Sequence, residues 1–113
     1  MKNLTEAEIG QLNLLEEMYR DGYFPNALVD RIKQILVDVC RSIEAASPKS
    51  DAELYSITHA ATERINDLQD DFDEAGSEIE TVARDSIAVS FGKVASAYGF
   101  EPDLEELVAT RDW

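Results

Sequence analysis

Residues 25–46 read PNALVDRIKQILVDVCRSIEAA, and this stretch decides the fold class. Its apolar side chains recur every three or four residues, which is typical of an α-helix with one buried face. Pro25 suits the first helical turn, where its missing amide proton would have no partner. Pro48 pushes the residue before it away from helical geometry. We therefore predict a helix from Pro25 or Asn26 to about Ala46. Its core-facing residues are Leu28, Ile32, Ile35, Leu36, Val39 and Ile43.

The segment before this helix shows the same period. Thr5 and Glu8 have the spacing of a capping box, in which each side chain bonds a free amide of the first turn. Gly22 can adopt the left-handed conformation that ends many helices. The pattern predicts one helix from Thr5 to Gly22.

Two further helices are predicted to begin at Ser50 and Ser77, because each serine is followed three residues later by a glutamate. They should end near Gly76 and Gly99. Gly92, inside the second of them, indicates close approach of another helix. The apolar faces comprise Leu54, Ile57, Ala61, Ile65, Leu68 and Phe72 in the first, and Ile79, Val82, Ala83, Ile87, Phe91, Val94, Ala95 and Tyr98 in the second.

A short last helix can follow Pro102, capped by Asp103 and Glu106. Trp113 is expected to dock against the core, because burial of its large ring is strongly favourable. No segment alternates with period two, and no long linker divides the chain. We predict an all-α fold in one domain, residues 1–113: a compact bundle of four main helices plus a short C-terminal helix.

Charge limits the classes of partner. The 113 residues carry 24 acidic and 10 basic side chains, a formal net charge of -14. Residues 1–49 hold 8 acids and 6 bases, whereas residues 50–113 hold 16 acids and 4 bases. The electric field of a chain with this net negative charge repels phosphate backbones and anionic lipids. We therefore expect no nucleic-acid or membrane partner, and an acidic surface that is either merely solvated or suited to a basic protein.

Other features favour a soluble cytoplasmic protein. No apolar run approaches the roughly 18 residues of a membrane span, and the N-terminus lacks a signal-peptide pattern. The single cysteine, Cys40, cannot form an intramolecular disulfide, and it lies beside the apolar helix face, where an inert buried thiol is expected. No phosphate loop, nucleophile elbow or Cys/His cluster is present in the sequence. Catalysis is not indicated, and we expect no cofactor.

One polar face of the third predicted helix is a candidate site. At 100° per residue it gathers five side chains: Tyr55, His59, Glu63, Asn66 and Asp70. A histidine and a glutamate four residues apart could share a divalent metal, or the imidazole could act as an acid or base. Metal centres normally use three or four ligands from several elements. A solvated i,i+4 pair is therefore the simpler interpretation of His59 and Glu63.

The acidic stretch 67–78 is the second candidate. An EF-hand alignment fails there, because Ala75 and Val82 fall where ligands are required. Acids near a helix C-terminus are unfavourable by several tenths of a kcal/mol, so a basic partner or a weakly bound cation would relieve them. We expect an interaction surface there, formed by Asp70, Asp71, Asp73 and Glu74.

Four motifs carry a resemblance. They are Tyr23-Phe24-Pro25, Thr58-His59-Ala60-Ala61-Thr62-Glu63, Ser77-Glu78-Ile79-Glu80-Thr81-Val82-Ala83-Arg84 and Ala109-Thr110-Arg111-Asp112-Trp113. Together they resemble an uncharacterised family of small acidic bacterial proteins, a domain of unknown function. The resemblance implies no activity and no catalytic residues.

The leading hypothesis is a non-enzymatic, acidic helical module that binds a basic protein. A sharper form is an immunity or antitoxin-like inhibitor, since an acidic protein can cover a cationic nuclease cleft. The alternative is a weak metal-binding protein or metal-dependent enzyme using His59, Glu63 and Asp70. The chain could be a monomer or a homodimer, the latter through exposed Leu14 and Val37.

Overall fold

The computed structural model describes residues 2–113, which contain seven helices and no strand. The all-α prediction is confirmed. The helices are α1 (Glu6–Gly10), α2 (Glu16–Arg20), α3 (Asn26–Ala46), α4 (Asp51–Asn66), α5 (Gln69–Glu74), α6 (Thr81–Ala97) and α7 (Leu104–Leu107).

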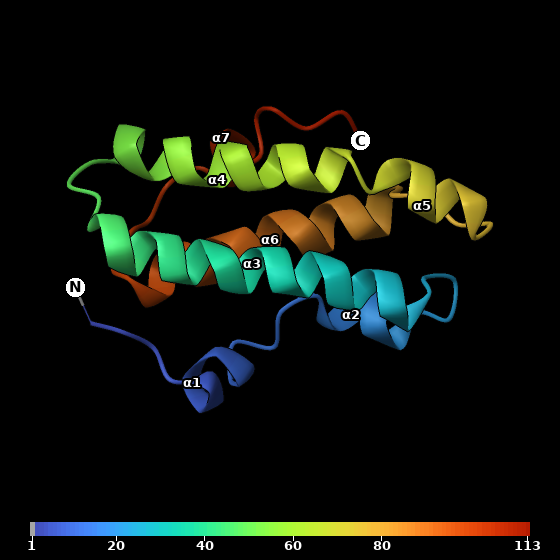
Figure 1. The fold of residues 1–113 in the computed structure, drawn as a ribbon, viewed down its shortest axis with the longest axis horizontal. Helices are drawn as coiled ribbons and strands as arrows, with labels where there is room; N and C mark the ends of the chain where they lie inside the picture. The colour runs from blue at the N-terminus through green and yellow to red at the C-terminus, as the bar shows by residue number, and fades with distance from the viewer. Residues whose placement is uncertain (1) are drawn as a thin grey trace.

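Three long helices form the body of the molecule. Figure 1 shows α3 and α4 side by side and antiparallel, with α6 behind them. Helix α2 packs against α3 and α6, and α7 packs against α4 and α6. Helix α1 stands on an arm below α3. The bundle therefore has three main helices where four were predicted. The five-residue α2 takes the place of the fourth.

One hydrophobic core joins these helices. Ile32 of α3, Ile65 of α4 and Phe91 of α6 are fully buried, as the helical spacing predicted. Trp113 is 8% exposed and belongs to the same core, so its predicted docking is confirmed. Leu14 is also buried, so the prediction that Leu14 extends an exposed dimer interface is wrong.

The first predicted helix is divided in two. Asn13 and Leu15 adopt left-handed backbone conformations, with φ of 52° and 59°. For leucine this costs about 1–2 kcal/mol. Two contacts offset that cost: the Leu15 side chain is fully buried, and its amide donates a 2.9 Å hydrogen bond to the Ser90 hydroxyl of α6. The Thr5 capping box is formed as predicted.

The third predicted helix ends earlier than expected, and the fourth begins later than expected. Helix α4 stops at Asn66, and α5 begins at Gln69 after a break. Helix α6 begins at Thr81, so the predicted capping box of Ser77 with Glu80 is absent. Ser77 instead follows α5, where its amide donates to the Phe72 carbonyl.

Gly92 marks the predicted close approach. The Leu104 side chain, at the start of α7, lies so close that a Cβ on Gly92 would be 2.4 Å from Leu104 Cδ2. Asp103 caps α7 as predicted, but it accepts from the amide of Glu105 and not from that of Glu106, the residue that the predicted spacing paired with it. None of the helices in residues 2–113 combines the length and the apolar character of a membrane-spanning segment.

Candidate functional site

The predicted His59 face of α4 is covered by the C-terminal segment, residues 103–113. His59 Nε2 lies 2.6 Å from the Glu106 carbonyl oxygen. A carbonyl oxygen only accepts, so Nε2 carries the hydrogen and donates. The Thr110 hydroxyl donates to the His59 carbonyl at 3.2 Å. The Tyr55 ring stacks on the imidazole at a centroid distance of 5.8 Å. His59 therefore anchors this segment.

Asn66 extends the same contact toward the C-terminus. Its side-chain amide donates to the Thr110 carbonyl at 3.0 Å, and its side-chain oxygen accepts from the Asp112 amide at 2.9 Å. Trp113, one residue further, is buried in the core. Tyr55, His59 and Asn66 thus position the C-terminal segment on α4.

Glu63 and Asp70 stand apart from this contact. Glu63 is exposed, and its side chain makes no hydrogen bond or ion pair within the described residues. The bond to Glu106 leaves only Nδ1 of His59 open to a metal. No group of three His, Cys, Asp or Glu side chains in residues 2–113 is arranged to hold a metal ion.

The acidic stretch lies at the end of the bundle where α4, α5 and the start of α6 meet (Figure 1). The break after Asn66 places Asp70 and Asp71 in the first turn of α5, where the helix dipole favours negative charge. The predicted electrostatic conflict therefore holds only for Asp73 and Glu74, in the last turn. Asp71 is paired with Arg31 of α3 at 3.0 Å.

A recess of about 270 Å³ opens at this acidic end. Asp70, Asp73 and Glu78 surround it, and no ion pair within residues 2–113 involves any of the three. Glu74 and Asp67 are exposed nearby and also lack ion pairs in that part of the chain. We name these five side chains the acidic end: Asp67, Asp70, Asp73, Glu74 and Glu78.

A second polar cluster, around Glu44, had no signal in the sequence. The Glu44 side chain is 6% exposed and accepts hydrogen bonds from the Tyr98 hydroxyl, Arg41 and the Leu4 amide. Arg41 also donates to the Leu4 carbonyl at 2.9 Å. The cluster ties the N-terminal arm to α3 and α6. Burial raises the pKa of the neighbouring Cys40 thiol, which fits the inert thiol that its position predicted.

The model of a family of unknown function, DUF5713, matches residues 8–113. The chain belongs to this family. Its resemblance to a domain of unknown function is therefore confirmed. The DUF5713 match includes the acidic end, the C-terminal segment and both Glu44 and Tyr98, whereas Leu4 lies outside it.

No curated protein and no solved structure matches this DUF5713 chain. Its function therefore has to be argued from its own side chains.

Proposed function

We propose that this DUF5713 chain is a non-enzymatic binding module whose acidic end engages a basic protein. The carrying observation is that the five carboxylates of the acidic end make no ion pair within residues 2–113. Unpaired carboxylates of one sign focus a negative field at that end, which accelerates encounter with a cationic surface and repels anionic ones.

Two arginines near the acidic end already form ion pairs with other carboxylates. Arg31 pairs with Asp71 beside the acidic end, and Arg64 pairs with Asp38 on the neighbouring helix, each at 3.0 Å. Both arginines line a recess with Asp67, but neither forms an ion pair with a carboxylate of the acidic end. A partner that brings lysines or arginines would supply counter-charge through charge-assisted hydrogen bonds.

A sharper form of the proposal is a bacterial, cytoplasmic inhibitor that covers a cationic cleft of a toxin-like nuclease. The small size and the net charge of -14 support it, since electrostatic steering gives such inhibitors high association rates. In this form the acidic end occupies the surface on which the nuclease would bind phosphates.

The test compares two variants of equal charge. In the acidic-end variant, Asp70→Asn, Asp73→Asn and Glu78→Gln remove three charges from the recess. In the control, Glu6→Gln, Glu63→Gln and Glu101→Gln remove three exposed charges elsewhere. Each protein is immobilised and exposed to a lysate of its source cell at about 0.1 M and about 1 M NaCl, which shortens the Debye length from about 10 to about 3 Å.

We expect one basic protein to be retained at low salt by the wild type and by the control, and to be lost with the acidic-end variant or at high salt. The purified pair should then show an affinity that falls with salt. If no retained protein distinguishes the wild type from the acidic-end variant, the proposal is wrong.

A further inference from the structure

The outer face of α6 carries two apolar side chains that are partly exposed, and Leu104 of α7 adds a third beside them. Val82 and Val89, two turns apart, are each 42% exposed. Leu104, 39% exposed, lies over Gly92, one turn beyond Val89. The three side chains form a row along α6, and from Val82 to Gly92 the helix rises about 15 Å. Among residues 2–113 the remaining large apolar side chain with comparable exposure is Tyr23.

A groove of about 260 Å³ lies along the first half of this row. Val82 and Val89 form its apolar part, and Glu17 of α2 and Asp85 of α6 flank it. The Ser86 hydroxyl donates to the Glu17 carboxylate at 3.2 Å, which holds that charge at the groove. Neither Glu17 nor Asp85 takes part in an ion pair within residues 2–113.

The groove lies on the part of α6 that follows the acidic end in the chain. Glu78 of the recess precedes Val82 by four residues, and α5 lies beside the start of α6 (Figure 1). Two bases also lie near the row: Arg84 donates to the Thr81 hydroxyl, and Lys93 donates to the Asn13 carbonyl. The lining of the groove itself combines two apolar side chains with the two carboxylates of Glu17 and Asp85, and it contains no base.

We propose that this groove binds one amphipathic helix of a partner protein, with basic residues beside its apolar stripe. This inference rests on the proposed function and specifies the element of the partner that is bound. Apolar side chains two turns apart match the i,i+7 spacing of a partner helix, as in other helix-in-groove complexes. Because valine is stiff at χ1, ordering Val82 and Val89 on binding costs little entropy.

Charge argues for a foreign helix and against a second copy of this chain. In a symmetric dimer the same patch faces itself, so the carboxylates of Glu17 and Asp85 would be brought close to those of the second copy. Two chains of net charge -14 also repel each other at long range. Lysines or arginines flanking a leucine stripe would instead pair with Glu17, Asp85 and Glu78.

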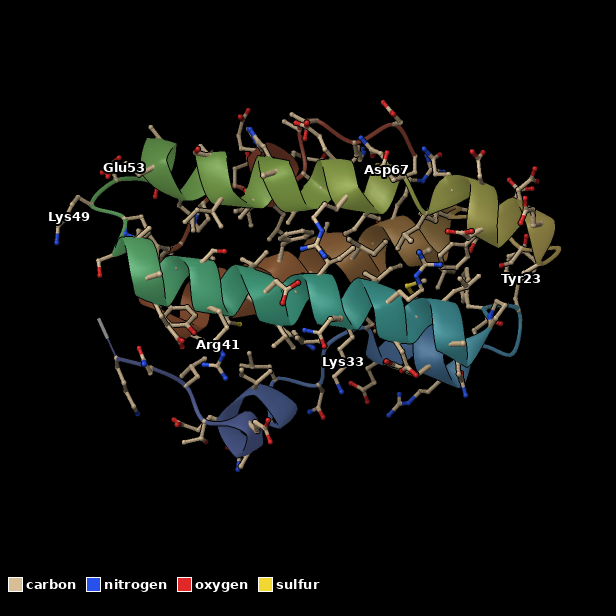
Figure 2. All side chains as sticks on the ribbon, viewed as in Figure 1. Tyr23, Lys33, Arg41, Lys49, Glu53 and Asp67 are labelled. Carbon is tan, nitrogen blue, oxygen red and sulfur yellow. The ribbon has the colours of Figure 1, made fainter. Side chains whose placement is uncertain are left out.

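The test uses two synthetic peptides of about 20 residues, long enough to form a helix. The amphipathic peptide repeats Leu-Lys-Lys-Leu-Leu-Lys-Lys, which places leucine on one face. The scrambled peptide has the same composition without an apolar face. Binding to the full chain is measured by calorimetry for the wild type, V82S/V89S, the acidic-end variant and Y23S. The Y23S control removes an equally exposed apolar side chain away from α6 (Figure 2).

We expect V82S/V89S to weaken the amphipathic peptide about tenfold, or about 1.4 kcal/mol, and to leave the scrambled peptide unchanged. Y23S should bind both peptides as the wild type does. The acidic-end variant should weaken both peptides, since it removes attraction that does not depend on an apolar face. In the wild type, amide chemical shifts should move at Glu17, Val82, Asp85 and Val89, a readout that requires no variant to fold.

Three outcomes overturn the inference. Equal affinities of the two peptides, unaffected by V82S/V89S, would show that charge alone attracts them, which leaves the proposed function standing. Shift changes confined to other helices would place the helix site elsewhere. A wild-type dimer in sedimentation that V82S/V89S abolishes would assign the groove to a second copy. Failure of the proposed function differs from all three, because the acidic-end variant would then bind both peptides like the wild type.

Discussion

The Tyr98 hydroxyl donates a 2.5 Å hydrogen bond to the Glu44 carboxylate, which joins the end of α6 to the last turn of α3. The same carboxylate accepts from Arg41 at 2.8 Å and from the Leu4 amide at 2.8 Å. A buried carboxylate is tolerated only when donors surround it. The stability of the N-terminal arm therefore depends on this cluster.

Replacing Tyr98 with Phe removes one of these donors while keeping the ring. A hydrogen bond to a charged group contributes about 1.5–3 kcal/mol, so Tyr98→Phe should lower the free energy of unfolding by about 2 kcal/mol. Urea denaturation measures the loss. Tyr23→Phe is the control, because the Tyr23 hydroxyl is exposed and makes no hydrogen bond within residues 2–113. A loss no larger than that of the control would show that the Glu44 bond contributes nothing.

The Glu44 cluster also predicts a dependence on pH. Burial acts to raise the pKa of Glu44, but hydrogen bonds from Tyr98, Arg41 and the Leu4 amide outweigh it and hold the pKa below its ordinary value of 4.5. The folded chain therefore releases this proton at lower pH than the unfolded chain. The stability that Glu44 contributes is complete above pH 4.5 and is lost as the pH falls through the folded pKa.

Glu44→Gln should remove that contribution. The difference in unfolding free energy between wild type and Glu44→Gln should be largest near neutral pH and should shrink below pH 4.5. Denaturation curves across the acid range measure it. A difference that stays constant from neutral pH into strong acid would contradict a depressed Glu44 pKa.

Helical periodicity correctly predicted a helix whose bounds depend only on residues within it and next to it in the chain. Helix α3 runs from Asn26 to Ala46 as expected, because its apolar stripe and both proline signals agree. The break at Leu15 could not be predicted in this way. The Ser90 hydroxyl that bonds the Leu15 amide is 75 positions away in the chain, and no local pattern reports such a partner.

Local patterns also predicted where some candidate site residues lie, but not which distant residues contact them. Spacing placed His59 and Asn66 on one face of α4 but could not show that Glu106 and Thr110 cover that face. The acidic end required only a run of carboxylates, so composition located it. The Glu44 cluster could not be predicted, because in the sequence a single glutamate beside an apolar stripe is indistinguishable from a solvated residue. Its role depends on contacts with Tyr98 and Leu4, which are distant in the chain.

The Ser90 contact gives a direct test of the break between α1 and α2. Ser90→Ala would leave the buried Leu15 amide without a partner, at a cost of about 1–3 kcal/mol. Ser96→Ala, on the exposed side of the same helix, is the control and should be neutral or slightly stabilising through helix propensity. Hydrogen exchange at the Leu15 amide should also accelerate in Ser90→Ala. Unchanged stability and exchange would mean that this bond does not hold the break.

Asn66 offers a spectroscopic test of the docked C-terminal segment. Asn66→Ala removes both hydrogen bonds to residues 110–112, and each contributes about 0.5–1.5 kcal/mol. Trp113 is the only tryptophan, so loosening of this segment should shift fluorescence emission to longer wavelength. Glu63→Ala, exposed on the same helix, should leave the emission unchanged. An Asn66→Ala spectrum identical to that of the wild type would show that Trp113 docks without Asn66.

Gly92 and Leu104 should be energetically coupled. Alanine in place of a helical glycine is worth about 1 kcal/mol in propensity, but here its Cβ would lie 2.4 Å from Leu104 Cδ2. Leu104 is partly exposed and can turn outward, which would lose its contact with α6. Gly92→Ala alone should therefore leave stability nearly unchanged. In a Leu104→Ala background the same substitution should stabilise by about 1 kcal/mol, and a double-mutant cycle by urea denaturation measures the difference. Equal effects in both backgrounds would show that Leu104 does not press on this glycine.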